Sequence, residues 1–137
     1  VSEESLRCTC GLDQVGKRVN LEKAMRLGDM LGGHMVSGHV DGVGEVIRFE
    51  PIGDNRELVI LAPAELGRYL AAKGSVVVNG VSLTTNRVMD VAGGCEFSIN
   101  LIPHTLSVTT LGAIQTGDRV NLEIDLVARY VERMLGK

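Results

Sequence analysis

The sequence has few of the features that mark nucleic-acid-binding or membrane-spanning proteins. It contains no tryptophan and only 3% aromatic residues, so it lacks the stacking platforms on which unpaired bases bind. Its formal net charge is −3 and it has no long lysine or arginine run, which argues against a phosphate-backbone partner. No apolar run approaches the roughly 18 residues of a membrane span. We therefore expect neither a nucleic acid nor a membrane as a partner.

Cysteine is also scarce, and its three positions form no C-x-x-C pair. Cys8 and Cys10 stand one residue apart, and Cys95 is isolated. An odd number of cysteines without a metal or redox spacing is typical of free, buried or half-buried thiols in a reducing compartment. We therefore expect a cytoplasmic protein without structural disulfides.

What the sequence does contain is β-branched residues separated by glycine. Its 137 residues suit one compact domain, and its 45% hydrophobic residues with 17 glycines allow a core of Val, Leu, Ile, Met and Ala between tight turns. Many short strands with frequent glycine turns indicate an all-β barrel or sandwich. The predicted strands are His39–Phe49, Glu57–Ala62, Ser75–Val78, Val81–Thr85 and Gly94–Leu101.

Helical spacing occurs in three places. Pro63–Ala72 begins with proline and carries an apolar stripe, and Leu126–Leu135 has one apolar and one polar side. Glu22–Leu31 shows a less regular helical pattern. The final helix can pack on its own barrel or associate with copies of itself, and its one and a half heptads do not decide between them.

An internal repeat organises the chain. Residues 5–22 align with residues 105–123 with a one-residue gap near Cys10, and the pentapeptide RVNLE occurs at 18–22 and at 119–123. The repeat length is about 100 residues, so residues 23–125 form one complete copy and residues 1–22 the tail of a preceding copy. We therefore expect a C-terminal piece of a protein with two tandem β domains and a site between the copies.

The glycine-rich stretch GGHMVSGHVDG, residues 32–42, raises the question of a metal site. Its two histidines, His34 and His39, are five residues apart, which places them about 140° apart on a helix and on opposite faces of a strand. Neither geometry converges on one metal, so we expect none. Two interpretations remain open: both are turn and strand-edge residues, or one moves a proton near neutral pH.

Two further clusters carry polar residues. In KGSVVVNGVSLT, residues 73–84, Asn79-Gly80 predicts a tight hairpin turn, and Ser82 and Thr84 alternate on one strand face. These hydroxyls are either exposed hairpin polar groups or partners for a polyhydroxylated ligand, and no serine-hydrolase motif surrounds Ser82. In LIPHTLSVTTLG, residues 101–112, Pro103 stops a strand and leaves backbone groups free to bind a flat heterocycle. His104 reads as a solvated turn residue.

Together, GGHMVSGHVDG, KGSVVVNGVSLT and LIPHTLSVTTLG make the chain resemble the C-terminal half of the α-subunit type of riboflavin synthase, over nearly its whole length. The resemblance implies a six-stranded antiparallel Greek-key barrel in residues 23–125. It also implies a C-terminal oligomerisation helix, residues 126–137, that helps to build a homotrimer. The implied reaction is the dismutation of two molecules of 6,7-dimethyl-8-ribityllumazine into riboflavin and 5-amino-6-ribitylamino-uracil, without cofactor or metal. The resemblance also implies an active site between the N-terminal barrel of one subunit and the C-terminal barrel of another.

The resemblance also implies roles for single residues. The resemblance assigns His39 and Ser82 to catalytic positions and leaves His34 structural. A base with a pKa near 7 is enough to remove the acidic C7-methyl proton of the lumazine. The matching substrate-binding positions are Lys73, Asn79, Thr84, Ile102 and Thr105. Many family members carry aspartate where Asn79 stands, and an amide cannot take a proton. We therefore expect Asn79 to bind and not to act as a base.

The family's reactive cysteine lies in the first barrel and matches none of the three cysteines in this sequence. The resemblance therefore predicts that this chain alone binds lumazine or riboflavin weakly and does not turn over. One alternative is a ligand carrier related to the lumazine- and flavin-binding antenna proteins of luminous bacteria. Another is a structural β domain whose glycine turns are only turns.

Overall fold

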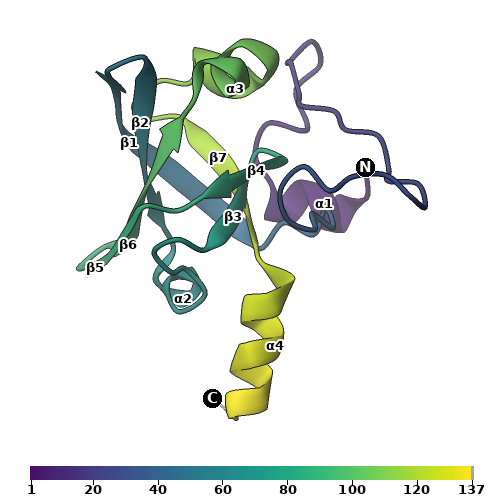
Figure 1. Cartoon of the computed structure of the whole chain (residues 1–137), viewed down its shortest axis with the longest axis vertical. Coiled ribbons are helices and arrows are strands. Elements are labelled where there is room, and N and C mark those ends of the chain that lie inside the picture. Colours follow the sequence, from purple (N-terminus) through teal and green to yellow (C-terminus); the bar gives the residue numbers. More distant parts are fainter. Residues whose placement is uncertain (137) are drawn as a thin grey trace.

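The computed structural model describes residues 1–136 and is built around one antiparallel β-sheet that curls on itself (Figure 1). Its strand order is β4-β3-β7-β1-β2-β6-β5. This confirms the all-β fold class. The strands are β1 (Gly42–Ile52), β2 (Asn55–Ala62), β3 (Ser75–Val78), β4 (Val81–Thr84), β5 (Arg87–Val91), β6 (Gly94–Leu101) and β7 (Arg119–Ile124).

The hairpin between β3 and β4 forms as the sequence predicts. Asn79 and Gly80 both have positive φ, 48° and 81°, which is the pattern of a two-residue turn whose twist matches the flanking strands. Val78 pairs with Val81 directly across this turn. The turn therefore sets the register that carries Ser82 opposite Val77.

The sheet has seven strands where six were expected, and the difference lies at Thr85 and Asn86. These two residues separate β4 from β5, the strands at opposite ends of the sheet. The N–H of Thr85 donates to the carbonyl of Gly74, next to β3, and the N–H of Asn86 donates to the carbonyl of Ser98 in β6. Residues 81–91 therefore run as one bent segment between β3 and β6, counted as two strands because of the break.

The core lies inside the curl and is aliphatic. All of its clustered buried residues fall between Val46 and Ile124, with Phe97 among the largest. Val81 and Leu83 of β4 also pack against this cluster, so the alternating Ser82 and Thr84 face outward. The predicted shared face of Ser82 and Thr84 is confirmed.

The helices are α1 (Glu3–Cys8), α2 (Ala64–Gly67), α3 (Pro103–Val108), the short 3₁₀ helix η1 (Thr110–Ala113) and α4 (Leu126–Leu135). The predicted bounds of the last helix are confirmed. The helix predicted over residues 63–72 is only four residues long, because Tyr69 and Leu70 make tighter i−3 hydrogen bonds to Leu66 and Gly67 instead of continuing it.

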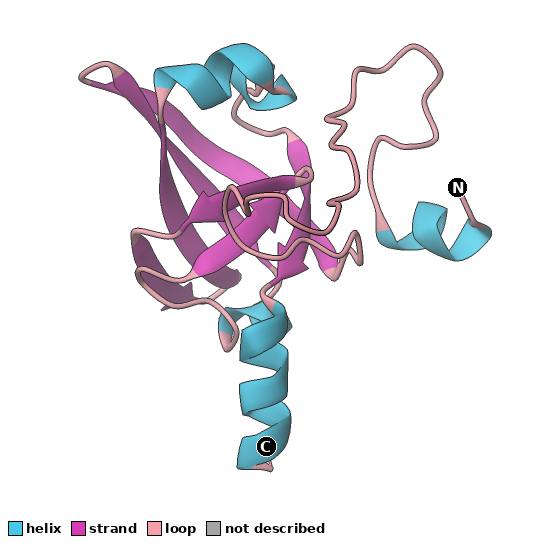
Figure 2. Ribbon diagram, turned by 45° about the vertical axis from the view of Figure 1, so that its right-hand side comes forward, coloured by secondary structure: helices cyan, strands magenta, loops and turns pink. Residues whose placement is uncertain are grey.

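The helix predicted over Glu22–Leu31 is wrong. Gly28 has φ of 93°, and the N–H groups of Arg26 and Asp29 are bonded within a local turn, to the Asp29 carboxylate and the Arg26 carbonyl. A left-handed glycine ends any right-handed helix there. Residues 9–41 instead run as loops beside β3, β4 and β7 (Figures 1 and 2).

No helix within residues 1–136 is both long and apolar enough to cross a membrane.

Candidate functional site

The segment between Gly33 and Asp41 lies across the outer face of the sheet and is held there by three contacts. His34 bonds Ser82 of β4, the N–H and hydroxyl of Ser37 donate to the Glu123 carboxylate of β7, and the Asp41 carboxylate accepts the Ile124 N–H. The glycine-rich stretch therefore covers one side of the sheet and brings a histidine to a serine.

The His34–Ser82 contact is close and double. The Nδ1 of His34 lies 2.7 Å from the Oγ of Ser82, and the His34 backbone N–H donates to the same oxygen at 3.2 Å. The neighbouring Gly33 has φ of 147°, and a Cβ there would lie 2.5 Å from the Ser82 oxygen. Glycine at this position is therefore required for the approach.

The tautomer of His34 decides what this pair can do. If Nδ1 carries the ring proton, it donates to the Ser82 oxygen, which also accepts the backbone N–H, and Nε2 is then the nitrogen that can accept a proton. The other ring nitrogen of His34, Nε2, is buried and has no hydrogen-bond partner among residues 1–136. A buried imidazole nitrogen without a partner is suited to a ligand group that shares a proton with it.

A cavity of about 470 Å³ opens on the same face and takes in Ser82. Four parts of the chain form it: the turn and start of β4, α3 with the residues that follow it, the first RVNLE segment, and Gly32. Its lining includes Gly32, Gly80, Ser82, His104, Thr105, Thr109, Thr110 and residues 18–22. Its volume falls in the range of small-molecule sites.

The LIPHTL segment supplies one wall through α3. β6 ends at Leu101, as Pro103 predicted, and Pro103 then takes the first turn of α3, where its missing N–H costs nothing. Thr105 is half-buried and lines the cavity. Ile102 precedes the helix and is exposed, and its carbonyl accepts the Leu106 N–H.

The predicted site residues do not all gather at this cavity. Ser82 and Thr105 line it, whereas Lys73 and Thr84 are exposed at the opposite end of the β3–β4 hairpin, where Thr84 pairs with Ser75. His39 is exposed between two residues bonded to β7, and neither His39 nor His34 is in the cavity lining. The structure therefore brings His34 to Ser82, and the catalytic role of His39 stays a prediction.

Asn79 has a structural task at the turn. Its side-chain oxygen accepts the Asn121 N–H at 2.8 Å, and its carbonyl accepts a hydrogen bond from the side chain of Asn20. An aspartate could accept the same N–H, so the amide keeps the turn attached to β7. Asn79 lines a neighbouring cavity of about 450 Å³.

Sequence reasoning missed Glu123, Asn20 and the part played by His34. Glu123 is a buried carboxylate, only 4% exposed, and the two Ser37 contacts satisfy it. The signal for Glu123 and Asn20 was available in the repeated RVNLE, which keeps an amide and a carboxylate between apolar strand residues. His34 gave no such signal, because its partner is distant in the sequence.

The thiols and acidic groups do not suggest other chemistry at this site. Burial, followed by a hydrogen bond that the thiol donates to the Asp90 carboxylate, raises the pKa of Cys95 to about 11, so this thiol stays protonated and unreactive at neutral pH. Within residues 1–136, no group of three His, Cys, Asp or Glu side chains is placed to hold a metal ion.

The curled antiparallel sheet thus carries a cavity of small-molecule size on its outer face, and Ser82 of the cavity wall bonds His34. The family model of the lumazine-binding domain matches residues 37–125. The chain therefore belongs to the lumazine-binding domain family.

Relatives of known name agree with this assignment. The chain is 48% identical to the riboflavin synthase of Photobacterium phosphoreum over 89% of this chain and 54% of the relative. It is 46% identical to the riboflavin synthase of Brucella abortus over 96% of this chain and 64% of the relative. The chain thus spans between about half and somewhat under two thirds of the length of these relatives.

Among solved structures, the chain is similar to LumP in complex with 6,7-dimethyl-8-(1'-D-ribityl) lumazine. The TM-score is 0.70 at 26% identity, over 89% of this chain and 64% of that one. A complex of LumP with riboflavin is similar at a TM-score of 0.58 and 28% identity, over 71% of this chain and 50% of that one.

Proposed function

We propose that this chain is the second lumazine-binding repeat of a riboflavin synthase. The full protein would transfer a four-carbon unit between two molecules of 6,7-dimethyl-8-ribityllumazine, giving riboflavin and 5-amino-6-ribitylamino-uracil. The observation that carries the proposal is the cavity whose wall holds Ser82, the residue that His34 bonds. Riboflavin synthases with up to 48% identity to this chain support it.

The pair suits the first chemical step, removal of a proton from the C7 methyl group of one lumazine. The resulting carbanion delocalises into the ring, so a base near neutrality is strong enough. His34 would take the proton at Nε2, its buried and unpartnered nitrogen, while Ser82 holds Nδ1 and so fixes the ring. His39 remains the rival base from the sequence resemblance.

Substrate binding would use the cavity wall and a second subunit. Thr105 and Ser82 offer hydroxyls to the ribityl chain. Lys73, Thr84 and Ile102 are exposed, which suits a composite site whose other half comes from another barrel. Asn79 would orient the turn beside the ligand through its bond to Asn121.

The architecture of the full protein follows the repeat. We propose two Greek-key barrels in tandem, with residues 1–22 as the end of the first and residues 23–125 as the second. Residues 81–91 would then count as one bent strand of a six-stranded barrel. The free thiols support a cytoplasmic location.

The final helix supports the predicted homotrimer. Arg129 of α4 pairs with Asp41, and its guanidinium lies 5.5 Å from the Tyr69 ring, which fixes the helix to the sheet. Glu132 also pairs with Arg68 at 2.8 Å. The opposite side of α4 exposes Val127, Tyr130, Val131, Met134 and Leu135. An apolar stripe held rigidly in solvent is typical of a helix that packs against copies of itself.

The test uses the full-length protein with lumazine as substrate. We expect Ser82→Ala and His34→Gln each to lower kcat about 100-fold, the lower range for a lost general base. The exposed Ser107→Ala on α3 is the matched control and should keep full turnover. If His39→Gln abolishes turnover while His34→Gln does not, His39 is the base. If the unchanged protein forms no riboflavin, the proposed activity is wrong.

A ligand carrier is the second candidate, favoured by the similarity to LumP. This chain alone should then bind lumazine or riboflavin, as it should under the first proposal. The two separate in the full-length protein, because a carrier would bind lumazine and enhance its fluorescence without producing riboflavin.

A further inference from the structure

The two copies of the repeat touch each other through equivalent residues. Asn20 and Asn121 occupy the same place in the two RVNLE segments, and Cys10 aligns with Thr110. The N–H of Thr110 donates to the Asn20 side-chain oxygen at 2.7 Å. The N–H of Cys10 donates to the Asn121 side-chain oxygen, also at 2.7 Å. In each copy, the asparagine side chain therefore accepts a backbone N–H from the equivalent position of the other copy.

The amide nitrogens of the two asparagines complete the reciprocity. The Asn20 Nδ2 donates to the Thr110 hydroxyl at 3.0 Å, and the Asn121 Nδ2 donates to the Cys10 carbonyl at 3.1 Å. Contact of residue i with j, matched by contact of j with i, is the mark of an isologous interface.

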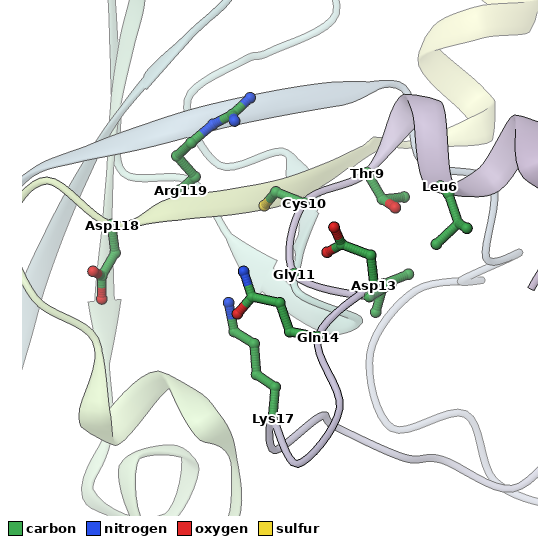
Figure 3. Close-up of a pocket in the computed structure, with 10 residues that line it drawn as sticks. Leu6, Thr9, Cys10, Gly11, Asp13, Gln14, Lys17, Asp118 and Arg119 are labelled. Carbon is green, nitrogen blue, oxygen red and sulfur yellow. The ribbon is translucent and has the colours of Figure 1, made fainter.

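The surroundings of these bonds are also paired by the repeat. The cavity of about 450 Å³ at this contact is lined by Arg18 and Arg119, by Asn20 and Asn121, and by Cys10 and Thr110. Figure 3 shows the adjoining pocket, where the loop carrying Cys10, Gln14 and Lys17 faces Asp118 and Arg119 at the start of β7. An approximate two-fold relation therefore extends beyond the hydrogen bonds.

The helices that precede the contact have the same form in both copies. α1 and α3 both span six residues, 100 positions apart, and both end at a threonine with φ of −122°. The hydroxyl of Thr9 donates to the Ser5 carbonyl, as that of Thr109 does to the Thr105 carbonyl. Each copy thus contacts the other through the same structural element, a helix turn followed by the RVN segment.

We propose that the Asn121–Thr110 surface is a self-complementary docking surface, and that a second copy of residues 23–137 occupies it whenever residues 1–22 do not. In that dimer, Asn121 of each copy bonds the Thr110 backbone of the other, in place of the bonds that Cys10 and Asn20 now make. The axis passes between the two asparagines, so the contact closes as a dimer and does not propagate.

The second copy is suited to an isolated test because its core is complete without the first. Every clustered core residue lies between Val46 and Ile124, and none of the first 43 residues is fully buried. The side chain of Asn121 bonds only Cys10 among residues 1–136, so its removal leaves the sheet's own hydrogen bonds intact.

The experiment compares residues 23–137 with the 137-residue chain by sedimentation equilibrium. We expect the oligomers of the shorter protein to contain twice as many chains as those of the longer one. This ratio holds whether or not α4 adds a further association step. Asn121→Ala should raise the dissociation constant of this doubling step at least tenfold, because two pairs of hydrogen bonds are lost. The exposed Asn100→Ala on β6 is the matched control and should leave it unchanged.

A peptide of residues 5–22 gives an independent readout, because it should compete for the surface and dissociate the dimer of residues 23–137. An Asn20→Ala version of the peptide should compete at least tenfold more weakly. The proposal is overturned if the shorter protein shows no doubling, if Asn121→Ala leaves the doubling unchanged, or if the peptide has no effect. Riboflavin synthase activity plays no part in these measurements.

Discussion

The same five residues, RVNLE, adopt two different structures in this chain. At 119–123 they lie in β7, where Val120 is 0% and Leu122 is 1% exposed. At 18–22 they form no strand, and Val19 is 49% and Leu21 is 91% exposed. The first copy has no neighbouring strands here, whereas β7 pairs with β1 and β3. Strand formation is therefore decided by partners and burial, and not by the pentapeptide.

The helices give the opposite result. α1 forms in the first repeat and α3 in the second with the same length and the same threonine after the last turn. Their hydrogen bonds close within four residues, so they need no distant strand. The comparison separates what the chain specifies locally from what it obtains only through long-range pairing.

The largest difference between the two pentapeptides is expected when the same leucine is replaced in both. Leu122→Ala should lower the free energy of unfolding by about 3 kcal/mol, because it empties a fully buried site. Leu21→Ala should change it by less than about 0.5 kcal/mol, because the side chain is already in solvent. Urea unfolding of both variants checks this. Equal losses would mean that residues 18–22 are packed in solution.

A smaller effect is expected where the first segment is tied to the sheet. Asn20→Ala removes three hydrogen bonds, to Asn79 and Thr110, and leaves the core untouched. Trypsin should then cleave after Lys17 and Arg18 about tenfold faster, while the urea midpoint stays the same. Glu22→Ala is the control, and equal cleavage in both variants would contradict the docking of this segment.

The smallest expected effect concerns the thiols of the two regions and the pH dependence of stability. Cys8 is exposed in α1, whereas Cys95 is buried in β6 and has a pKa raised by burial from 9.0 to about 11. Between these two pH values the unfolded thiol loses its proton and the folded one keeps it. The unfolded state then binds fewer protons, so stability falls as the pH rises from 9 towards 11.

Urea unfolding at about pH 8 and about pH 10 measures this loss. Cys95→Ala should remove part of the pH slope, while Cys8→Ala should leave it unchanged. An identical slope in the two variants would show that Cys95 does not contribute. At neutral pH, a thiol reagent should modify Cys8 in the native protein and spare Cys95.

Much of the sheet could be predicted because its strands are short, β-branched and bounded by turns. The predicted bounds of Ser75–Val78 and Gly94–Leu101 are confirmed for β3 and β6. β5 was missed because Arg87, Met89 and Asp90 leave little apolar alternation in an exposed strand. The strand count differs because the break at Thr85 and Asn86 depends on two different neighbouring strands.

The site was less predictable than the fold. Ser82 could be placed on the outer face from its alternation with Val81 and Leu83. The partner could not be chosen, because His34 and His39 stand in similar glycine-rich surroundings and only tertiary contact distinguishes them. The close approach that makes Gly33 necessary is visible only in the folded chain, where a Cβ would meet the Ser82 oxygen.

The bent segment through residues 81–91 has a consequence for solubility. β4 and β5 end the sheet, but they are only four and five residues long and are separated by two residues. Short, bent edge strands offer little unpaired backbone to the strands of another molecule. An aliphatic, valine-rich sheet of this kind would otherwise be prone to edge-to-edge aggregation, and the bend is a protection that does not depend on surface charge.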